Sequence, residues 1–333
     1  MSEKNPTSGE DREAVEEFFR FFELHGRHSL EIARQTILNE ISAIESTKVR
    51  EALRYFITDY WHDLARPTLL SVCCEAVGGI SRLTVPFTVS LSVLSGGIDI
   101  HDDIIDQSKR KHGRLTVYGR YGKEIALLVA DALLFKGFFL LNEACARIPA
   151  KKAQKIMKIV NWSFYELGDA EALELELRGH CNVTSEQYLR IIEKKAADVE
   201  AHARIGALLG NATIVEENSL ARYGRLLGMI IIIRDDIEDS LDTQEIKHRL
   251  EKEHMPLPLV YAFEAIRYGN LQRILSDKML ENFQKDIEKG IEQSNNILKE
   301  LVNKSSVSIK NLEINKDLRK LLEALSLSPI GSE

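Results

Sequence analysis

The sequence predicts an all-α protein, a single-domain bundle of long helices. Apolar residues recur at steps of three and four along most of the 333 residues, as expected on the buried face of a helix. The chain holds only 7 prolines and 19 glycines, so few breaks are expected. No series of alternating apolar and polar residues, no repeat and no long linker indicates a sheet or a second domain. We expect a disordered tail over residues 1–11 and one all-α domain over residues 12–333.

Each expected helix is bounded by a break in this pattern. In the first part of the chain the breaks fall at Gly26, Glu45–Lys48, Val77–Ser81 and Arg110–Thr116. The helices that these breaks leave cover residues 12–24, 27–44, 47–60, 66–79 and 84–107. The later helices are expected over residues 120–147, 150–178, 184–210, 214–241, 245–268 and 276–301.

Two local patterns refine this assignment. Thr184 and Gln187 have the spacing of a capping box, with Thr184 as the N-cap of its helix. Residues 307–317 are the one stretch with weak strand character, and a last short helix is expected after it.

Composition excludes several classes of protein. Hydrophobic residues make up 44% and charged residues 29% of the chain, as in a folded globular protein. The net charge of -7 argues against a general nucleic-acid binder. The longest apolar run, Leu226–Ile233, is far shorter than the roughly 20 residues of a membrane-spanning helix. The four cysteines have no metal-site spacing, and the polar first residues resemble no signal peptide, so we expect a cytoplasmic protein without a transmembrane segment.

Four aspartates lie within eight residues at the end of an expected helix. Asp99, Asp102, Asp103 and Asp106 share one helix face, where each like-charged pair costs about 0.2 to 0.5 kcal/mol. A Mg²⁺ ion offsets such repulsion, because it binds one or two carboxylates and completes its shell with water and phosphate oxygens. The alternative is an acidic solvated face. The apolar stretch over Val89–Ile98 favours the metal or diphosphate interpretation.

A second acidic cluster follows about 130 residues later. The apolar stretch Met229–Ile233 leads into the acidic residues Asp235, Asp236, Glu238, Asp239 and Asp242, among which the pattern Asp-Asp-x-x-Asp occurs again. Two facing carboxylate arrays would hold Mg²⁺ ions around one diphosphate. A di-iron bundle also uses inward carboxylates, but it needs Glu-x-x-His on two helices, and this chain has that spacing at Glu251–His254 alone.

In their order and separation these motifs resemble those of the trans-type polyprenyl diphosphate synthases. The resemblance runs from about residue 25 to residue 300, and it includes the segments ARPTLL (65–70), LLVADALLFKGF (127–138) and YLRIIEKKAADVEAHARIGALLG (188–210). It implies the isoprenoid synthase fold with a central cavity and three Mg²⁺ ions on an allylic diphosphate. Ionisation then gives an allylic cation, which isopentenyl diphosphate attacks. It also implies a homodimer.

The resemblance assigns roles to particular residues. The metal-binding and catalytic positions are matched by Asp102, Asp103, Asp106, Asp235, Asp236 and Asp239. Lys195 matches the lysine that contacts the departing diphosphate, and Arg66 matches an arginine of the isopentenyl diphosphate site. Lys111 and His112 follow the first motif where two substrate-binding arginines are usual. Gly97 and Ile98 leave room for a product of about twenty carbons or more, although glycines here also permit close helix packing.

The sequence departs from the family mainly in the isopentenyl diphosphate site. Asp63 stands in place of a phosphate-binding lysine, and Ser95 stands in place of a histidine. Ala196 replaces a threonine, and Ile231 and Ile232 replace a Phe-Gln pair. The basic residues that could compensate are Arg54, Arg82 and Arg114. Near the second motif, Lys247, Arg249 or Lys252 could supply a cation to the diphosphate, or this segment is a solvated face. Asp99 either adds a charge to the metal site or pairs with a buried base.

Three hypotheses remain open at this stage. The first is a prenyltransferase that condenses an allylic diphosphate with isopentenyl diphosphate through a rebuilt site. The second is an enzyme similar to a class I terpene synthase, which ionises an allylic diphosphate without isopentenyl diphosphate. The third is a low-activity subunit of a hetero-oligomeric prenyl synthase. The complete aspartate motifs argue against the third, because a non-catalytic subunit has no need for such repulsion.

Overall fold

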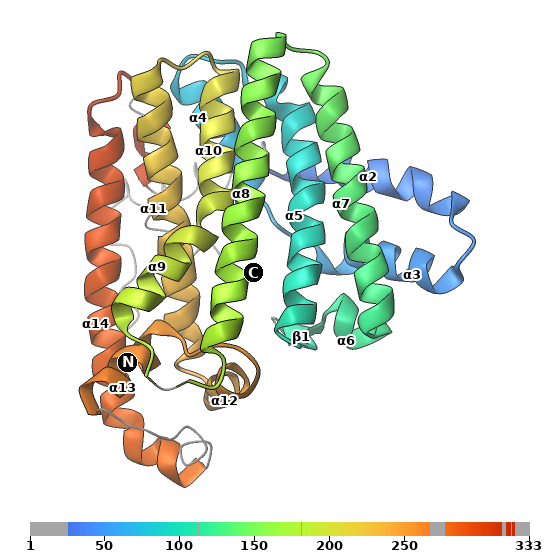
Figure 1. The fold of residues 1–333 in the computed structure, drawn as a ribbon. Helices are drawn as coiled ribbons and strands as arrows, with labels where there is room; N and C mark the ends of the chain where they lie inside the picture. Colours follow the sequence, from blue (N-terminus) through green and yellow to red (C-terminus); the bar gives the residue numbers. More distant parts are fainter. Residues whose placement is uncertain are drawn as a thin grey trace, which may run out of the picture.

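The computed structural model describes residues 26–111, 113–180, 182–266, 277–314, 318–320 and 322–323, and the side chains of residues 265–282 are left out of the description. The expected tail and first helix, His112 and the end of the expected helix 245–268 lie outside the described residues. Over these residues the protein is all-α apart from one short hairpin, and the predicted fold class is confirmed (Figure 1).

The helices follow one another closely along the chain. The α-helices of the first half are α2 (His28–Glu40), α3 (Thr47–Tyr55), α4 (Ala65–Ala76), α5 (Val85–Ile105), α6 (Val117–Tyr121), α7 (Lys123–Cys145) and α8 (Ala150–Leu177). The later ones are α9 (Ser185–Lys195), α10 (Ala197–Leu209), α11 (Ile214–Asp239), α12 (Thr243–Lys252), α13 (Leu257–Ile266) and α14 (Asp277–Lys310). Short helical turns are η2 (Ile41–Ala43), η3 (Phe56–Tyr60) and η4 (Ser81–Thr84), and the hairpin strands are β1 (Arg110–Lys111) and β2 (Arg114–Leu115).

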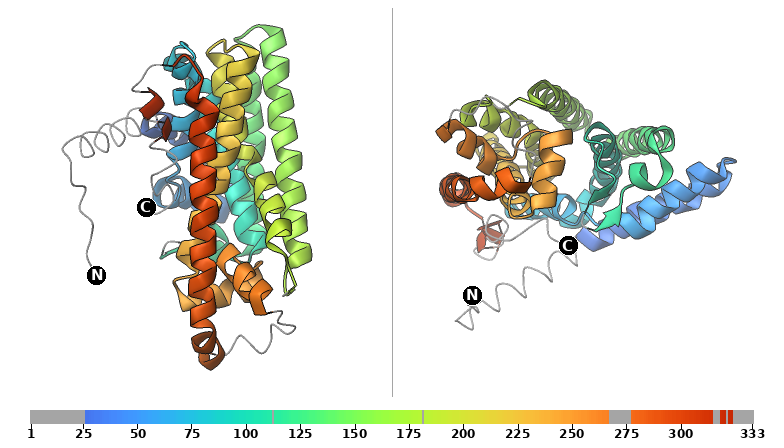
Figure 2. Two further views of the ribbon diagram at one scale, coloured as in Figure 1. Left: turned by 90° about the vertical axis from the view of Figure 1, so that its left-hand side faces the viewer. Right: turned by 90° about the horizontal axis from the view of Figure 1, so that it is seen from below.

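The long helices stand roughly side by side and form a bundle. Helix α5 packs along α7, α10 packs against α4 and α11, and α14 runs along α11 and α13. Seen from below, these helices surround the middle of the molecule, while α2 and α3 project to one side (Figure 2). The bundle therefore places the C-terminal ends of α5 and α11 at the same end of the molecule (Figure 1).

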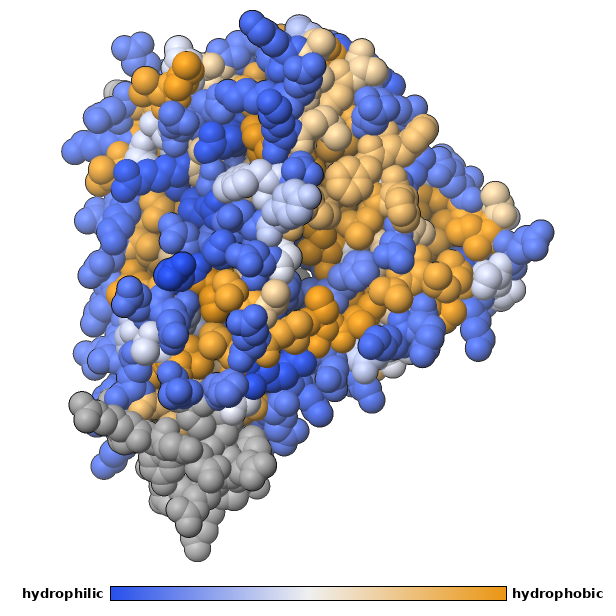
Figure 3. Space-filling model, in the orientation of Figure 1, coloured by the Kyte–Doolittle hydropathy of each residue, from blue (hydrophilic) through white to orange (hydrophobic). Residues whose placement is uncertain are grey.

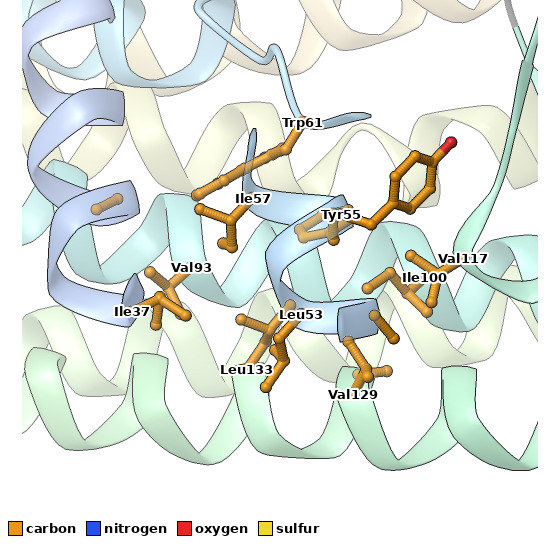
Figure 4. Close-up of a cluster of buried hydrophobic side chains, with 14 of the residues drawn as sticks. Ile37, Leu53, Tyr55, Ile57, Trp61, Val93, Ile100, Val117, Val129 and Leu133 are labelled. Atoms are coloured by element: carbon orange, nitrogen blue, oxygen red, sulfur yellow. The ribbon is translucent and has the colours of Figure 1, made fainter. Parts of the chain in front are cut away.

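The projecting helices are held by an apolar cluster between them and the bundle. Leu53 and Ile57 pack with Val93, Val129 and Leu133, which lie on α5 and α7 (Figure 4). All of these side chains are buried. Burying a side chain of this size stabilises the fold by about 1.5 to 3 kcal/mol.

Several expected helix boundaries need correction. The expected helix 120–147 is divided at Gly122, whose φ of 83° suits glycine. The expected helix 184–210 is divided at Ala196, although the capping box at Thr184 is confirmed. The expected helix 245–268 is interrupted between α12 and α13, where Pro256 lacks the amide hydrogen that a continuous helix needs.

Two other expectations were wrong. Residues 307–310 were expected as part of a strand, but they continue α14. Ile309 is buried together with Ser305 and Leu301, four and eight residues earlier, which is the spacing of one helix face. The hairpin of β1 and β2 was not expected at all, since each strand has only two residues.

One segment meets the length and composition of a membrane span, contrary to the expectation from uninterrupted apolar runs. Serines interrupt the apolar residues of Ser81–Ile105, but the mean hydropathy of this segment is still high enough for a membrane-spanning helix. However, 72% of its most apolar window is buried within the protein, and α5 packs against α2, α4 and α7. A core helix of a bundle has the same composition.

Candidate active site

The first aspartate motif lies where α5 ends. Gln107 has a φ of 57°, and the amide of Ser108 donates to the carbonyl of Asp103 at 2.9 Å, which is the hydrogen bond of a Schellman motif. The carboxylates thus stand at the negative end of the helix dipole, which adds to their mutual repulsion. Cationic side chains nearby must offset this cost.

The hairpin of β1 and β2 places one such cation, Lys111, beside the first motif. Lys111 Nζ lies 2.9 Å from Asp102 Oδ2 and 3.0 Å from Asp103 Oδ1. Lys111 is paired with Arg114 in the antiparallel register, so the two side chains leave the same face of the hairpin. The expected position of Lys111 beside the first motif is therefore found in the structure.

The second motif lies at the end of α11. Asp236 is buried, and its carboxylate accepts hydrogen bonds from Arg249, the Tyr188 hydroxyl and the Leu257 amide. Arg249 also lies 3.1 Å from Asp239. Asp235, in contrast, is exposed, so the second motif presents one free and one fully engaged aspartate.

Lys195 and Glu253 extend the first motif toward the second. Nζ of Lys195 lies 2.7 Å from Glu174, 3.0 Å from Glu171 and 3.9 Å from Asp102. A second connection runs through Glu253, which accepts a hydrogen bond from Ser108 at 3.3 Å and lies 3.2 Å from Arg249, the partner of Asp236. The two motifs, about 130 residues apart in sequence, therefore belong to one polar network.

The network shifts the pKa values of the first motif in opposite directions. Burial opposes ionisation of Asp102, but Lys111 and Lys195 outweigh it and lower its pKa to about 2. Burial raises the pKa of Asp103 to about 6 despite Lys111. Burial, Asp102 and Glu253 raise the pKa of Asp106 to about 8, although Arg178 lies 3.6 Å away. The site thus holds more carboxyl groups than its own cations can keep ionised.

The carboxylates suit Mg²⁺ chemically, although they do not form a complete metal site by themselves. Oδ2 of Asp103 is buried and accepts no hydrogen bond, and the donor set consists of the hard oxygen ligands that Mg²⁺ prefers. Within the described part of the chain, no three ligating side chains of the metal-binding types are close enough to hold an ion. Further oxygens would have to come from substrate phosphate and water.

Arg66, expected to bind isopentenyl diphosphate, is engaged by three carboxylates. Its guanidinium lies 2.6 Å from Asp198, 2.8 Å from Asp63 and 3.5 Å from Asp99. Asp99 thus pairs with a base, one of the two roles expected for it. Asp63, expected in place of a phosphate-binding lysine, thus also occupies the arginine that was expected to bind isopentenyl diphosphate.

A group of basic residues gathers around His62, which precedes Asp63 in the sequence. His62 Nε2 lies 2.8 Å from Arg114, and its Nδ1 lies 3.2 Å from Arg34. A neutral imidazole accepts at one nitrogen only, so one of these contacts brings two donors together. Partial burial and the two guanidinium groups lower the pKa of His62. We call Arg34, His62 and Arg114 the basic cluster; an anion would resolve its repulsion.

The two glycines ahead of the first motif serve helix packing. A Cβ on Gly96 would lie 3.0 Å from the Phe56 ring, and a Cβ on Gly97 would lie 2.9 Å from Leu134. This supports the second of the two roles expected for them, close packing against η3 and α7.

Several residues of the network were not expected from the sequence. They are Glu171, Glu174, Arg178, Tyr188, Glu253 and His254, and each belongs to a helix or loop whose place at the site depends on the fold. Arg249 was expected as one of three possible cations, and the structure places it on the second motif. His112 lies outside the described residues.

A comparison with protein families finds one match, the polyprenyl synthetase family, over residues 48–294. The geranylgeranyl diphosphate synthase of Methanosarcina mazei is 30% identical over 197 residues, which are 59% of this chain and 60% of that protein. The short chain isoprenyl diphosphate synthase of Methanothermobacter thermautotrophicus is 28% identical, over 74% of this chain and 76% of that protein. The match thus spans about 60% of the length of the first relative and about three quarters of the second.

Solved structures show the same fold. The geranylgeranyl pyrophosphate synthetase of Pyrococcus horikoshii superimposes with a TM-score of 0.80 at 24% identity, covering 95% of this chain and all of that one. A decaprenyl diphosphate synthase of Rhodobacter capsulatus superimposes with a TM-score of 0.78 at 20% identity, covering 94% and 98%. At these identities the likeness establishes the fold.

Proposed function

The chain belongs to the polyprenyl synthetase family, and from this premise we propose that it is a Mg²⁺-dependent trans-prenyltransferase that condenses an allylic diphosphate with isopentenyl diphosphate. The observation that carries the proposal is the polar network that joins Asp102, Asp103 and Asp106 to Asp236 and Asp239. Both motifs stand at helix C-termini, where their carboxylates are destabilising unless a cationic ligand is bound. Such a cost is expected at a functional site rather than at a structural one.

The residues of the network have different roles in the first step, the ionisation of the allylic diphosphate. Lys111 and Lys195 carry the positive charges that would contact the diphosphate, and Arg249 orients Asp236 and Asp239. Mg²⁺, when bound, supplies Lewis-acid stabilisation of the departing diphosphate. The allylic C–O bond breaks, and the diphosphate leaves with the electron pair. Because Lys111 and Lys195 already lie at the first motif, their charge is in place before the bond breaks.

The second substrate decides between two candidate functions. The engagement of Arg66 favours the alternative, ionisation of an allylic diphosphate without isopentenyl diphosphate. The basic cluster favours condensation, because Arg114 leaves the same hairpin face as Lys111 and can hold a second diphosphate beside the first. The double bond of isopentenyl diphosphate then attacks the cation, and loss of a proton gives the longer diphosphate. We prefer condensation for this reason.

We also propose a homodimer and a product of about twenty carbons or more. Exposed apolar side chains gather on α7 and α8, over the hydrophobic part of the surface in Figure 3: Leu127, Leu128, Phe135, Phe138, Phe139, Met157, Trp162 and Tyr165. Monomeric proteins rarely expose an apolar patch of this kind, so a second copy is a suitable partner. The names of the relatives from Methanosarcina mazei and Pyrococcus horikoshii support the product length.

The experiment is to incubate the purified protein with Mg²⁺ and farnesyl diphosphate, with and without isopentenyl diphosphate, and to identify the products. An elongated diphosphate formed only when both substrates are present supports condensation. A hydrocarbon or alcohol from farnesyl diphosphate alone supports the alternative. No product under either condition, with activity restored by a second chain, would indicate the subunit hypothesis.

A further inference from the structure

A cationic cavity opens on the outer side of the bundle, apart from the aspartate motifs. It has a volume of about 470 Å³ and lies between α8, α9, α10 and α11. Its five cationic side chains are Arg190, Lys194, Arg204, Arg222 and Arg225. Three glutamates also line it, so the lining carries two net positive charges in a protein whose net charge is -7. This surface belongs to the hydrophilic side of the face in Figure 3.

Buried carboxylates fix part of this cavity. Glu200 is buried and accepts from Arg204 at 2.6 Å and from Arg225 at 2.7 Å. Arg225 also lies over the ring of Trp162, with Cζ 5.1 Å from the ring centroid. Arg204 and Arg225 are therefore held in place without a ligand, as a preorganised binding site requires.

Two further guanidinium groups of the cavity are free. Among the residues that the structure describes, Arg190 and Arg222 form no ion pair, and both are exposed. The other three cations of the lining are paired with carboxylates, so Arg190 and Arg222 supply the positive charge that an anion would neutralise. Arginine binds phosphate groups with two parallel hydrogen bonds, so phosphate oxygens suit this lining better than a single carboxylate.

We propose that this cavity is a second binding site for a diphosphate group, separate from the catalytic site. The choice of a diphosphate rests on the proposed function, because the proposed reaction both consumes and releases molecules with this group. The group can come from inorganic diphosphate or from a prenyl diphosphate. The volume lies within the range of small-molecule sites, and it leaves room for an organic substituent.

The cavity is connected to the catalytic network through the last turn of α9. Lys194 lines the cavity and pairs with Glu166 and Asp169, whereas the next residue, Lys195, contacts Glu171 and Glu174 on the same helix α8. An anion that binds Lys194 therefore acts on the turn that positions Lys195. Occupancy of the cavity is expected to alter the rate of the proposed reaction.

Calorimetric titration with sodium diphosphate in EDTA tests the proposal without catalysis. The wild-type protein is expected to bind diphosphate, and the Arg190→Gln/Arg222→Gln variant is expected to bind it about tenfold more weakly or worse. Arg147→Gln/Lys151→Gln removes the same charge from exposed positions outside the cavity and should leave binding unchanged. The same titration with farnesyl diphosphate and with orthophosphate identifies the source of the group.

Three results would overturn the proposal. They are absence of binding to the wild-type protein, equal binding by the Arg190→Gln/Arg222→Gln variant, and loss of binding in Lys111→Gln but not in that variant. The last result would assign the anion to the catalytic site. Because no turnover is measured, a failed titration and a failed elongation assay are separate outcomes.

Discussion

Replacing Lys195 with glutamine tests the polar network most closely. Lys195 Nζ lies 2.7 Å from Glu174 and 3.0 Å from Glu171, and the Glu174 side chain is only 8% exposed. The variant keeps most of the side-chain volume but removes the charge that stabilises these carboxylates. Removing one partner of a buried ion pair costs about 3 to 5 kcal/mol, so we expect a loss of about 2 to 4 kcal/mol near pH 8, where part of the site remains hydrated.

The loss should depend on pH in a definite direction. Burial raises the pKa of Glu174 to about 7 even with Lys195 present. A carboxyl whose folded pKa is raised contributes stability that is present below the unfolded pKa, near 4.5, and is lost as the pH rises through the folded pKa. Without Lys195 the folded pKa rises further. The loss should therefore be smaller at pH 5.5, where Asp102 is ionised but Glu174 is protonated in both proteins, and should increase above pH 7.

Urea denaturation at pH 5.5, 7 and 8.5 measures this difference. Lys194→Gln is the matched control, because Lys194 neighbours Lys195 in sequence but forms surface ion pairs with Glu166 and Asp169. Such pairs contribute about 0 to 1 kcal/mol, and the control should show no marked pH dependence. A Lys195→Gln loss that is equal at all three pH values, or no larger than that of the control, would refute the network as described.

Three further predictions follow from other parts of the molecule. Gly97→Ala should destabilise the protein by about 1 to 3 kcal/mol in thermal or urea unfolding, because the new Cβ would lie 2.9 Å from Leu134. Gly168→Ala is the control: its new Cβ would have no atom within 4 Å, so this variant should stabilise the helix by up to about 1 kcal/mol. Arg114→Gln should raise the KM for isopentenyl diphosphate about tenfold and leave that for the allylic diphosphate unchanged. Arg110→Gln, on the other hairpin face, should change neither, and equal effects of both variants would contradict the role of the basic cluster. Phe135→Asp should convert a dimer to a monomer of 37.8 kDa in light scattering, and an unchanged mass would place the dimer interface elsewhere.

The all-α fold could be predicted from the sequence because apolar residues recur with helical periodicity. The two aspartate motifs could be predicted because each is defined by the spacing of neighbouring residues. The helix breaks at Gly122 and Ala196 could not, since a single residue at each ends one helix and begins another without a loop. The apolar run that ends at Ile233 and the motif after it mark the end of α11 directly in the sequence.

The rest of the site depends on contacts between distant segments. Glu174 and His254 are 80 positions apart, the first on α8 and the second in the loop between α12 and α13, and no local pattern indicates that they come within 3.5 Å. The engagement of Arg66 by Asp198 spans 132 positions, so the sequence could show the loss of a lysine at Asp63 but not the occupation of the remaining arginine. Only the packing of α4 against α10 brings that pair together.

The central claim is that the aspartates of both motifs act together on an allylic diphosphate. The most direct test is the rate of inorganic diphosphate release from farnesyl and isopentenyl diphosphates with Mg²⁺, compared among the wild type, Asp102→Asn, Asp239→Asn and Asp242→Asn. Asp242 is the N-cap of α12, a role that asparagine also fills, so that variant is the control. We predict a loss of about 100-fold or more for Asp102→Asn and Asp239→Asn and a wild-type rate for Asp242→Asn. A wild-type rate in Asp102→Asn or Asp239→Asn would contradict the account.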